Sequence, residues 1–294
     1  MPLPKELLKK VRNIEIRTRH IVNDVFAGSY HSAFQGQGME FQEVREYFPG
    51  DDIRSIDWNV TARMNAPFIK KFREERELTM MLVVDISASH DFGSTELMKR
   101  DVAAEIAAVL AFAAIKNNDK VGLILHTDKV EKVIAPGKGS RHVLRVISDV
   151  LSATPEDLGT DFAPAIDHVN LITHRKSIVF FISDFITDKE FRRPISVLGR
   201  KHDTAAIIIG DQRERDWPKT GLIDFTDPET GKRSFVDFGS AKIRAKLSER
   251  FDQRRENILA QLRRAGVDTV EIRADQPYER ALMKFFKMRA GRPR

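Results

Sequence analysis

The chain has 294 residues, of which 41% are hydrophobic and 31% are charged, and its formal net charge is +6. This composition is typical of a folded globular protein and excludes a disordered chain. There is no cysteine, which excludes disulfides, thiolate metal sites and a cysteine nucleophile. The apolar runs are far shorter than the roughly 20 residues of a bilayer span, and the N-terminus lacks the apolar core of a signal peptide. We therefore expect a cytoplasmic protein without a membrane span.

Residues 1–77 are predicted to hold an N-terminal helix and a segment that packs on the sheet formed by the remainder. Regularly spaced apolar residues predict an amphipathic helix over 4–26. Residues 27–38 are polar and rich in glycine, which predicts a loop. Residues 39–77 are dense in charged and aromatic side chains, and we expect them to pack on that sheet rather than to form an independent domain.

The charged and aromatic residues of this segment allow two interpretations. The favoured one is an internal network of ion pairs and hydrogen bonds that fastens the segment to the sheet. The alternative is a surface that recognises a partner. The residues concerned are Glu43, Arg45, Asp51, Asp52, Arg54, Asp57, Trp58 and Arg63.

Residues 78–290 are predicted to form one α/β domain, because strand and helix patterns alternate along them. Apolar runs predict strands at 78–85, 120–127, 177–183, 204–209 and 268–273, with an edge strand at 129–134. Helices are predicted at 95–117, 140–152, just after Thr160, and at 188–200, 240–265 and 276–289. Residues 211–240 form an insertion, in which the Asp227–Gly231 turn sequence predicts a β-hairpin. The expected fold is a mostly parallel sheet with helices on both faces.

Three predicted strands end in an acidic residue, namely Asp85, Asp128 and Asp184. In such sheets, ligands bind beyond the carboxyl ends of the strands, where the strand order reverses. Alternate side chains of an extended segment point the same way, so Asp85, Ser87 and Ser89 are expected to converge. Thr160 is predicted to open a helix with its hydroxyl free at a loop tip. We interpret Asp128 as an ordinary turn residue.

These side chains offer hard oxygen ligands, which suit Mg²⁺ or Mn²⁺. We predict a weakly bound ion, because only two of the ligands are charged and several waters remain on such an ion. Two carboxylates balance the divalent charge, and the ion keeps a position for a further carboxylate from outside. The predicted metal ligands are Asp85, Ser87, Ser89, Thr160 and Asp184.

The pattern Asp85-x-Ser87-x-Ser89, followed by Thr160 and Asp184, resembles the metal-ion-dependent adhesion site (MIDAS) of von Willebrand factor A domains. The wider chain, over about residues 36 to 285, resembles the bacterial domain-of-unknown-function family 58. The stretches that carry this resemblance are Gly38 to Glu77, LVVDISAS, NNDKVGLILHTD, the turn at Pro136–Gly139 and DPETGKRSFVD.

This resemblance implies a von Willebrand factor A-like fold and a function. Members of the family are typically found alongside MoxR-type AAA+ ATPases, and von Willebrand A domains elsewhere bind proteins through a metal that grips an acidic side chain. The expected function is therefore a non-enzymatic adaptor that binds the ATPase or its client. His90 follows the motif and could approach the metal or a partner's carboxylate, but an exposed loop residue is the favoured interpretation. His126, inside an apolar strand, is interpreted as a hydrogen-bonded core residue rather than a ligand.

Two other classes of function are less well supported by the sequence. A Mg²⁺-dependent phosphoryl-transfer or hydrolytic enzyme needs a nucleophile or base beside the metal, and Ser87 stands where an aspartyl-nucleophile phosphatase has its second Asp. Nucleic-acid binding is suggested by residues 241–294, which hold 15 Lys/Arg and 7 Asp/Glu. No aromatic-basic binding motif accompanies this charge, so it ranks third.

Overall fold

The computed structural model describes residues 5–22, 26–34, 40–64, 66–73, 77–94, 97–226 and 233–291. The chain forms two compact units, one of residues 1–34 with 79–294 and the other of residues 35–78. The second unit ends where the first buried strand was predicted to begin, and the N-terminal helices belong to the larger unit. No helix in the described part of the chain is both long and apolar enough to cross a membrane.

The larger unit is built on a six-stranded sheet with the order β10-β7-β6-β3-β4-β5. Neighbouring strands are parallel except for β5, which runs antiparallel to β4 at one edge. The mostly parallel α/β sheet predicted from the sequence is thus confirmed. The strands are β3 (Thr79–Asp85), β4 (Lys120–His126), β5 (Val130–Gly137), β6 (Ile178–Ser183), β7 (Asp203–Gly210) and β10 (Asp268–Arg273).

The strand order reverses on either side of β3. From β3 the chain adds β4 and β5 on one side, and then crosses back to place β6 on the other side. The connections that leave β3 and β6 therefore diverge, and this opens a crevice at the carboxyl ends of these two strands. In sheets of this kind, ligands bind at such loops, which here follow Asp85 and Ser183.

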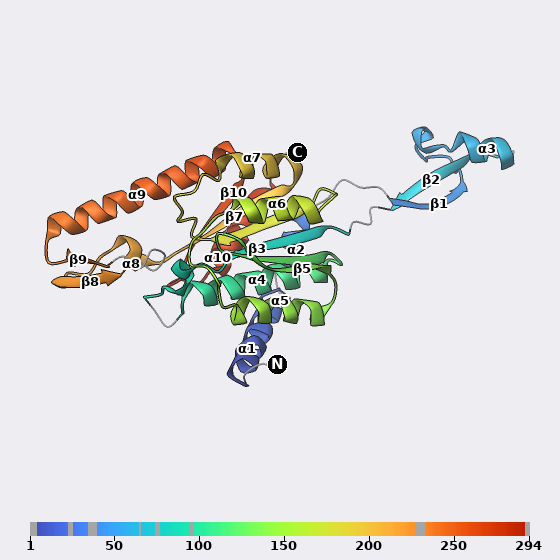
Figure 1. The fold of residues 1–294 in the computed structure, drawn as a ribbon. Coiled ribbons are helices and arrows are strands. Elements are labelled where there is room, and N and C mark those ends of the chain that lie inside the picture. The colour runs from blue at the N-terminus through green and yellow to red at the C-terminus, as the bar shows by residue number, and fades with distance from the viewer. Residues whose placement is uncertain are drawn as a thin grey trace. The chain divides into compact units, whose positions relative to one another are not determined.

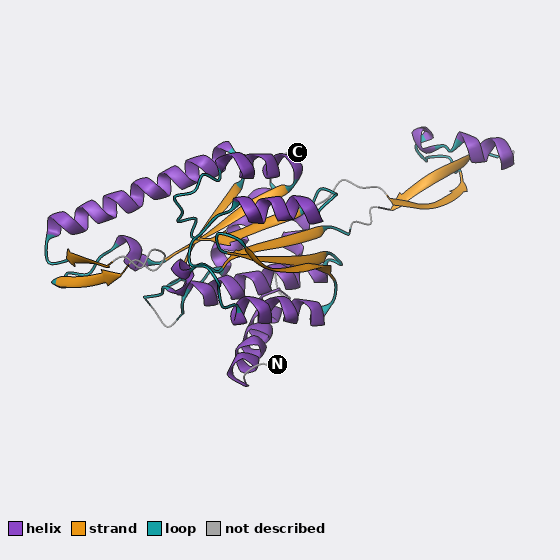
Figure 2. Cartoon of the chain, viewed as in Figure 1, coloured by secondary structure: helices purple, strands orange, loops and turns teal. Residues whose placement is uncertain are grey.

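Helices cover both faces of this sheet (Figure 1). One face carries α4 (Lys99–Lys116), with α5 (Ser140–Ser152) and α1 (Lys5–Ile21) packed against it. The other carries α6 (Ala163–Ile172), α7 (Arg192–Lys201) and the long α9 (Ala241–Arg264), as Figure 2 shows. α10 (Glu279–Ala290) packs on β10 and on α2 (Ala27–Ala33).

The two covered faces explain why the strand sequences are continuously apolar. In β3, Met81 and Val83 join the core cluster beneath α6, α7 and α9, which also contains Phe181 and Leu262. Met80, next to them in sequence, is also fully buried. Successive side chains point to opposite faces of a sheet, so a strand buried on both faces has no place for an alternating polar residue.

The prediction of a loop over residues 27–38 is wrong for its first half, because Ala27–Ala33 form α2. Tyr30 and Phe34 are buried and their rings contact Phe286 of α10. The Tyr30 hydroxyl donates to the Asp119 carboxylate at 2.9 Å. Burial of these aromatic rings outweighs the low helix propensity of the glycine and serine residues among them.

The predicted hairpin is present as β8 (Leu222–Thr226) and β9 (Arg233–Asp237), which pair antiparallel. Its predicted turn, at residues 227–231, lies outside the described residues. A short helix, α8 (Gln212–Arg215), connects β7 to this insertion. α8 matters for the site because it carries Glu214.

The smaller unit contains β1 (Glu40–Glu46), α3 (Trp58–Met64) and β2 (Phe68–Arg73), with β1 and β2 paired antiparallel. A single 3-10 turn, η2 (Ile53–Ser55), connects β1 to α3. Its charged residues pair with each other, since Arg45 binds Asp51 through two hydrogen bonds of 2.8 and 2.9 Å. Lys70 likewise lies 3.1 Å from Asp57. The large apolar side chains exposed on this unit are Phe48, Ile53, Trp58 and Met64.

Candidate functional site

Two aspartates lie at the carboxyl ends of neighbouring strands. Asp85 is the last residue of β3, and Asp184 directly follows β6, the parallel neighbour of β3. Both are buried, with 1% and 3% of their surface exposed. They occupy the place that the sequence predicted, where the strand order reverses.

Hydrogen bonds fix the orientation of the Asp85 carboxylate. The backbone amide of Ser87 donates to Oδ1 at 2.9 Å, and the Ser183 hydroxyl donates to Oδ2 at 2.6 Å. The Ser183 oxygen accepts from the amide of Phe185, so its own proton is directed at Asp85. Ser183 was not predicted as a site residue. The only signal for it is its position beside Asp184 at the end of the strand adjacent to β3.

Ser87 and Ser89 converge through a turn rather than through an extended segment. Residues Ala88–Asp91 form a short 3-10 helix, η3, directly after Ser87. The two hydroxyl oxygens are buried and lie 3.1 Å apart. The predicted convergence of these two serines is thus observed, but the geometry expected for it is wrong, because the chain coils after Ser87.

Thr160 lies in a loop that contacts both strand ends. The carbonyl of Leu158 accepts from the amide of Ala88 at 3.2 Å, and the carbonyl of Thr160 accepts from the Thr187 hydroxyl at 2.6 Å. Helix α6 begins three residues later, at Ala163, so Thr160 does not open it. The Thr160 side-chain oxygen is buried and has no hydrogen-bond partner among the described residues.

His90 is not the exposed loop residue that the sequence suggested. It is fully buried in η3, and its Nε2 lies 3.8 Å from Asp85 Oδ2. Neither ring nitrogen has a hydrogen-bond partner in the described structure. Burial lowers the pKa of His90, although the nearby carboxylates of Asp85 and Asp184 act in the opposite direction. The ring is therefore a neutral imidazole at neutral pH, and its burial follows from the tight turn after Ser87.

Asp85, His90 and Asp184 form a compact group whose candidate ligand atoms all lie within 4.8 Å of one another. Two other strand-end residues stay outside it. His126 is a core residue, as predicted, whose Nδ1 lies 3.0 Å from the carbonyl of Thr127. Asp128 is exposed, in agreement with its interpretation as a turn residue.

A buried lysine that the sequence did not reveal contacts this group. Lys99, the first residue of α4, is 1% exposed, and its ammonium donates to Asp184 at 2.7 Å and to Glu214 at 2.6 Å. Burial by itself lowers the pKa of Lys99, but the two carboxylates outweigh it and raise that pKa. Burial by itself raises the pKa of Asp184, but the charge and hydrogen bond of Lys99 outweigh it, and that pKa is lowered.

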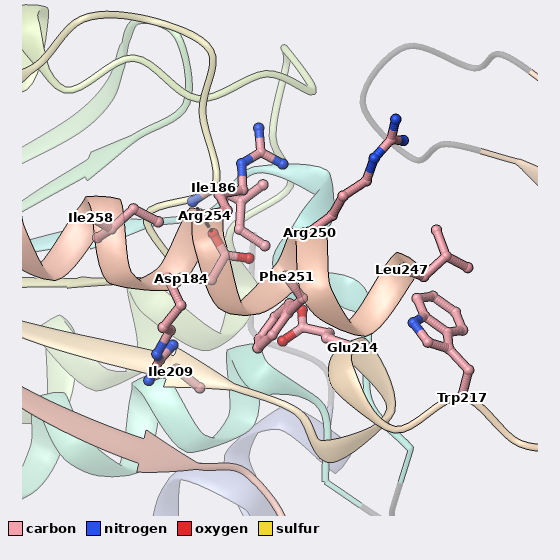
Figure 3. Close-up of a pocket in the computed structure, with 11 residues that line it drawn as sticks. Asp184, Ile186, Ile209, Glu214, Trp217, Leu247, Arg250, Phe251, Arg254 and Ile258 are labelled. Atoms are coloured by element: carbon pink, nitrogen blue, oxygen red, sulfur yellow. Dashed lines mark hydrogen bonds between the residues drawn. The ribbon is translucent and has the colours of Figure 1, made fainter. Parts of the chain in front are cut away.

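A pocket of about 410 Å³ adjoins the site and reaches Asp184 (Figure 3). Its wall is formed largely by α9, which contributes apolar and cationic side chains. Arg250 of α9 is exposed, whereas Arg254 binds Asp188 and Arg255 binds Glu271. The lining residues are Asp184, Ile186, Ile209, Glu214, Trp217, Leu247, Arg250, Phe251, Arg254, Arg255 and Ile258.

Comparison with known families gives a match over residues 43–257 to the family described as "Protein of unknown function DUF58". The chain belongs to this family. Uncharacterized proteins of Mycobacterium tuberculosis and Mycobacterium bovis are each 29% identical to this DUF58 protein over 287 residues, which covers 97% of this chain and 90% of theirs. The predicted family is therefore confirmed.

Three solved structures are among those similar to this DUF58 protein. One is a conserved hypothetical protein, BatB, from Bacteroides thetaiotaomicron, with 12% identity and a TM-score of 0.45 over 73% of this chain and 100% of that one. Another is an aerotolerance-related membrane protein from Bacteroides fragilis, with 14% identity and a TM-score of 0.47 over 72% of this chain and 98% of that one. A third is described as the SpRpn10 VWA domain, with 12% identity and a TM-score of 0.39 over 72% of this chain and 95% of that one.

Proposed function

We propose that this DUF58 protein is a non-enzymatic protein-interaction module that binds an acidic side chain of its partner through a divalent cation. The proposal is carried by the buried carboxylates of Asp85 and Asp184, at the ends of neighbouring strands, and by the buried Thr160 hydroxyl, which has no hydrogen-bond partner among the described residues. A buried polar atom without a partner is costly and uncommon in folded proteins. A cation in contact with the Thr160 hydroxyl would satisfy it.

The charges of the buried side chains also favour a divalent cation. Lys99 pairs with the carboxylates of Asp184 and Glu214, whereas the Asp85 carboxylate lies beside His90. The side chains of the site therefore include more carboxylates than ammonium or guanidinium groups. Uncompensated charge is expensive in a buried site, and one Mg²⁺ or Mn²⁺ ion would neutralise it.

The predicted ligands can bind such an ion if the hydrogen bond from Lys99 to one oxygen of Asp184 is broken. Lys99 contacts Asp184 and Glu214 at nearly equal distances, so it can remain paired with Glu214 when a metal approaches. Ser87, Ser89 and Thr160 then supply neutral oxygens. Mg²⁺ and Mn²⁺ accept oxygen ligands of this kind and keep several waters, and one of those waters can be replaced by a partner's carboxylate.

The pocket beside Asp184 supplies the route for that carboxylate. Asp184 lines the pocket although the rest of its surface is buried. Arg250 and Arg254 lie on the same wall, and guanidinium groups attract and orient carboxylates. We therefore infer that an aspartate or glutamate of the partner enters along α9 and reaches the ion from this side.

The proposed partner is a MoxR-type AAA+ ATPase or its client, with the protein acting as an adaptor in the cytoplasm. Support for this partner comes from the family resemblance, which is an analogy and not a property of the site. The absence of cysteine is in keeping with a reducing compartment.

Surface plasmon resonance with a purified MoxR-type ATPase tests the proposal. Asp184→Ala in Mg²⁺, and the unmodified protein in EDTA, should each lose roughly 2–5 kcal/mol of binding, about thirtyfold or more in affinity. The two losses should not add, because both remove one interaction. Asp128→Ala is the matched control, since it removes an exposed strand-end carboxylate outside the site.

Equal binding of the unmodified protein and Asp184→Ala in both buffers would refute capture through a metal. The basic helix α9 would then be the better candidate surface. Its signature would be a steep loss of binding with added salt, as expected of contacts made by exposed charges.

A further inference from the structure

His90 is unusual among the buried polar residues of the site. Its ring is fully buried, and both nitrogens lack a hydrogen-bond partner within the described residues. A buried imidazole normally donates through one nitrogen and accepts through the other. Leaving both unpaired gives up two hydrogen bonds in a place that water does not reach. This arrangement indicates that a group absent from the polypeptide itself binds one of the ring nitrogens.

The geometry identifies where that group lies. The candidate ligand atoms of Asp85, His90 and Asp184 are all within 4.8 Å of one another. Opposite ligands of one ion lie roughly 4.2 Å apart when each bond is about 2.1 Å. Small rotations of the side chains therefore bring all three onto one ion.

We propose that a ring nitrogen of His90 is a direct ligand of the cation, which makes the site selective for Mn²⁺ over Mg²⁺. This inference rests on the proposed cation site and adds the identity of the ion. Imidazole suits first-row transition ions, whereas Mg²⁺ prefers ligand sets made of oxygen. The two carboxylates and the hydroxyl groups keep the site hard enough for Mn²⁺. Residue 90 thus changes the oxygen-only site predicted from the motif into a mixed site.

Lys99 does not compete with His90 for this role. The ammonium contacts Asp184 and Glu214, whereas His90 approaches Asp85. An ion bound between Asp85, His90 and Asp184 displaces Lys99 from one carboxylate oxygen only.

Pulsed electron paramagnetic resonance of the full chain loaded with Mn²⁺ reports this ligand directly. A bound imidazole gives a ¹⁴N coupling, and this signal should be present in the unmodified protein, absent in His90→Gln and retained in His126→Gln. His126 is the matched control, because it is equally buried and lies outside the group, with its Nδ1 3.0 Å from the carbonyl of Thr127 and only its Nε2 without a partner among the described residues. The signal of the unmodified protein decides the question even if a variant fails to fold.

Calorimetric titration with Mn²⁺ and with Mg²⁺ completes the test. His90→Gln should weaken Mn²⁺ binding about tenfold or more and change Mg²⁺ binding by less than about twofold. Mn²⁺ binding without ¹⁴N coupling, and unchanged in His90→Gln, would overturn the role of His90 and leave the cation site standing. No binding of either ion at millimolar concentration would overturn both proposals.

Discussion

Lys99 is the side chain whose position most affects the chemistry of the site. It is buried between Asp184 and Glu214, and the two ion pairs keep it charged. Removing one member of a buried ion pair leaves the others without compensation, which typically costs 3–5 kcal/mol. A bound divalent cation would replace part of that lost charge.

Lys99→Met should therefore destabilise the metal-free protein by about 3–5 kcal/mol, and Mn²⁺ should raise its melting temperature more than it raises that of the unmodified protein. Thermal unfolding with and without Mn²⁺ measures both effects. Lys129→Met is the control, because Lys129 pairs with Glu156 and Asp157 at the surface. Equal stabilisation of both proteins by Mn²⁺ would show that the ammonium and the cation do not compete.

His202 provides a pH-dependent contribution to stability far from the site. It is 2% exposed, and its Nδ1 accepts from the backbone amide of Ser177 at 3.2 Å, which requires an unprotonated nitrogen. Its Nε2 lies 3.2 Å from the Thr173 hydroxyl oxygen, which itself donates to Val169. Burial, with the nearby charge of Lys201, lowers the pKa of His202 to about 4.

Unfolding therefore takes up a proton between pH 6.5 and 4, because an unfolded histidine has a pKa of about 6.5. The contribution of His202 to the free energy of unfolding is fully present above pH 6.5 and is lost as the pH falls toward 4. We expect a loss of about 1–2 kcal/mol after allowing for solvent screening. Urea unfolding across this range should show a shallower pH dependence for His202→Gln and an unchanged one for the exposed His174→Gln. Parallel curves for His202→Gln and the unmodified protein would contradict this assignment.

Helix α7 packs so closely against the end of α9 that one methyl group added at Gly199 is expected to be destabilising. A Cβ added at Gly199 would lie 2.9 Å from the backbone carbonyl of Ala265, at the end of α9. Alanine gains about 1 kcal/mol of helix propensity over glycine, but overpacking against a fixed backbone costs roughly 1–3 kcal/mol. We expect the steric clash to outweigh the gain in helix propensity, because a backbone carbonyl at a helix end cannot rotate away as a side chain can.

Gly199→Ala should thus lower the free energy of unfolding by about 0.5–2 kcal/mol, as measured by chemical denaturation. Val197→Ala in the same helix is the control, since Val197 is 58% exposed, and it should be neutral or slightly stabilising. A gain in stability for Gly199→Ala would mean that α7 and α9 separate at little cost.

At the scale of the whole chain, the smaller unit is too short to bury a core of its own. Residues 35–78 expose Phe48, Ile53, Trp58 and Met64, and domains of about 40 residues are rarely stable alone. We therefore keep the prediction that residues 39–77 pack on the sheet. The isolated segment should be unfolded, and the whole chain should melt in one transition.

Trp58→Ala tests this prediction by calorimetry. If Trp58 is buried against the sheet, its removal should cost roughly 3–5 kcal/mol and lower the single melting transition. Met64→Ala is the control, because Met64 is also exposed on this unit. It shows whether the loss of stability is specific to Trp58 or follows from any truncation of the exposed apolar side chains. Two transitions in the unmodified protein, only one of them sensitive to Trp58, would show that the unit is independent.

The sequence determined the sheet and the position of the carboxylates. Strands buried on both faces must be continuously apolar, so β3, β4, β6 and β7 were visible in the chain alone. Parallel strands end at the same edge, so the sequence alone predicts Asp85 and Asp184 close together. The stretch from Gly38 to Glu77, together with NNDKVGLILHTD and DPETGKRSFVD, also identified the family.

The tertiary structure decided what surrounds those carboxylates. His90 is buried because the chain coils after Ser87, and Lys99 reaches Asp184 because α4 begins at the crevice. Neither residue belongs to an apolar pattern, and each looks in the sequence like an ordinary polar residue at an element's end. Glycines and serines likewise concealed α2, whose aromatic rings pack on α10. Local patterns report which face of an element is buried, whereas the partner of a buried charge is chosen by residues far away in the chain.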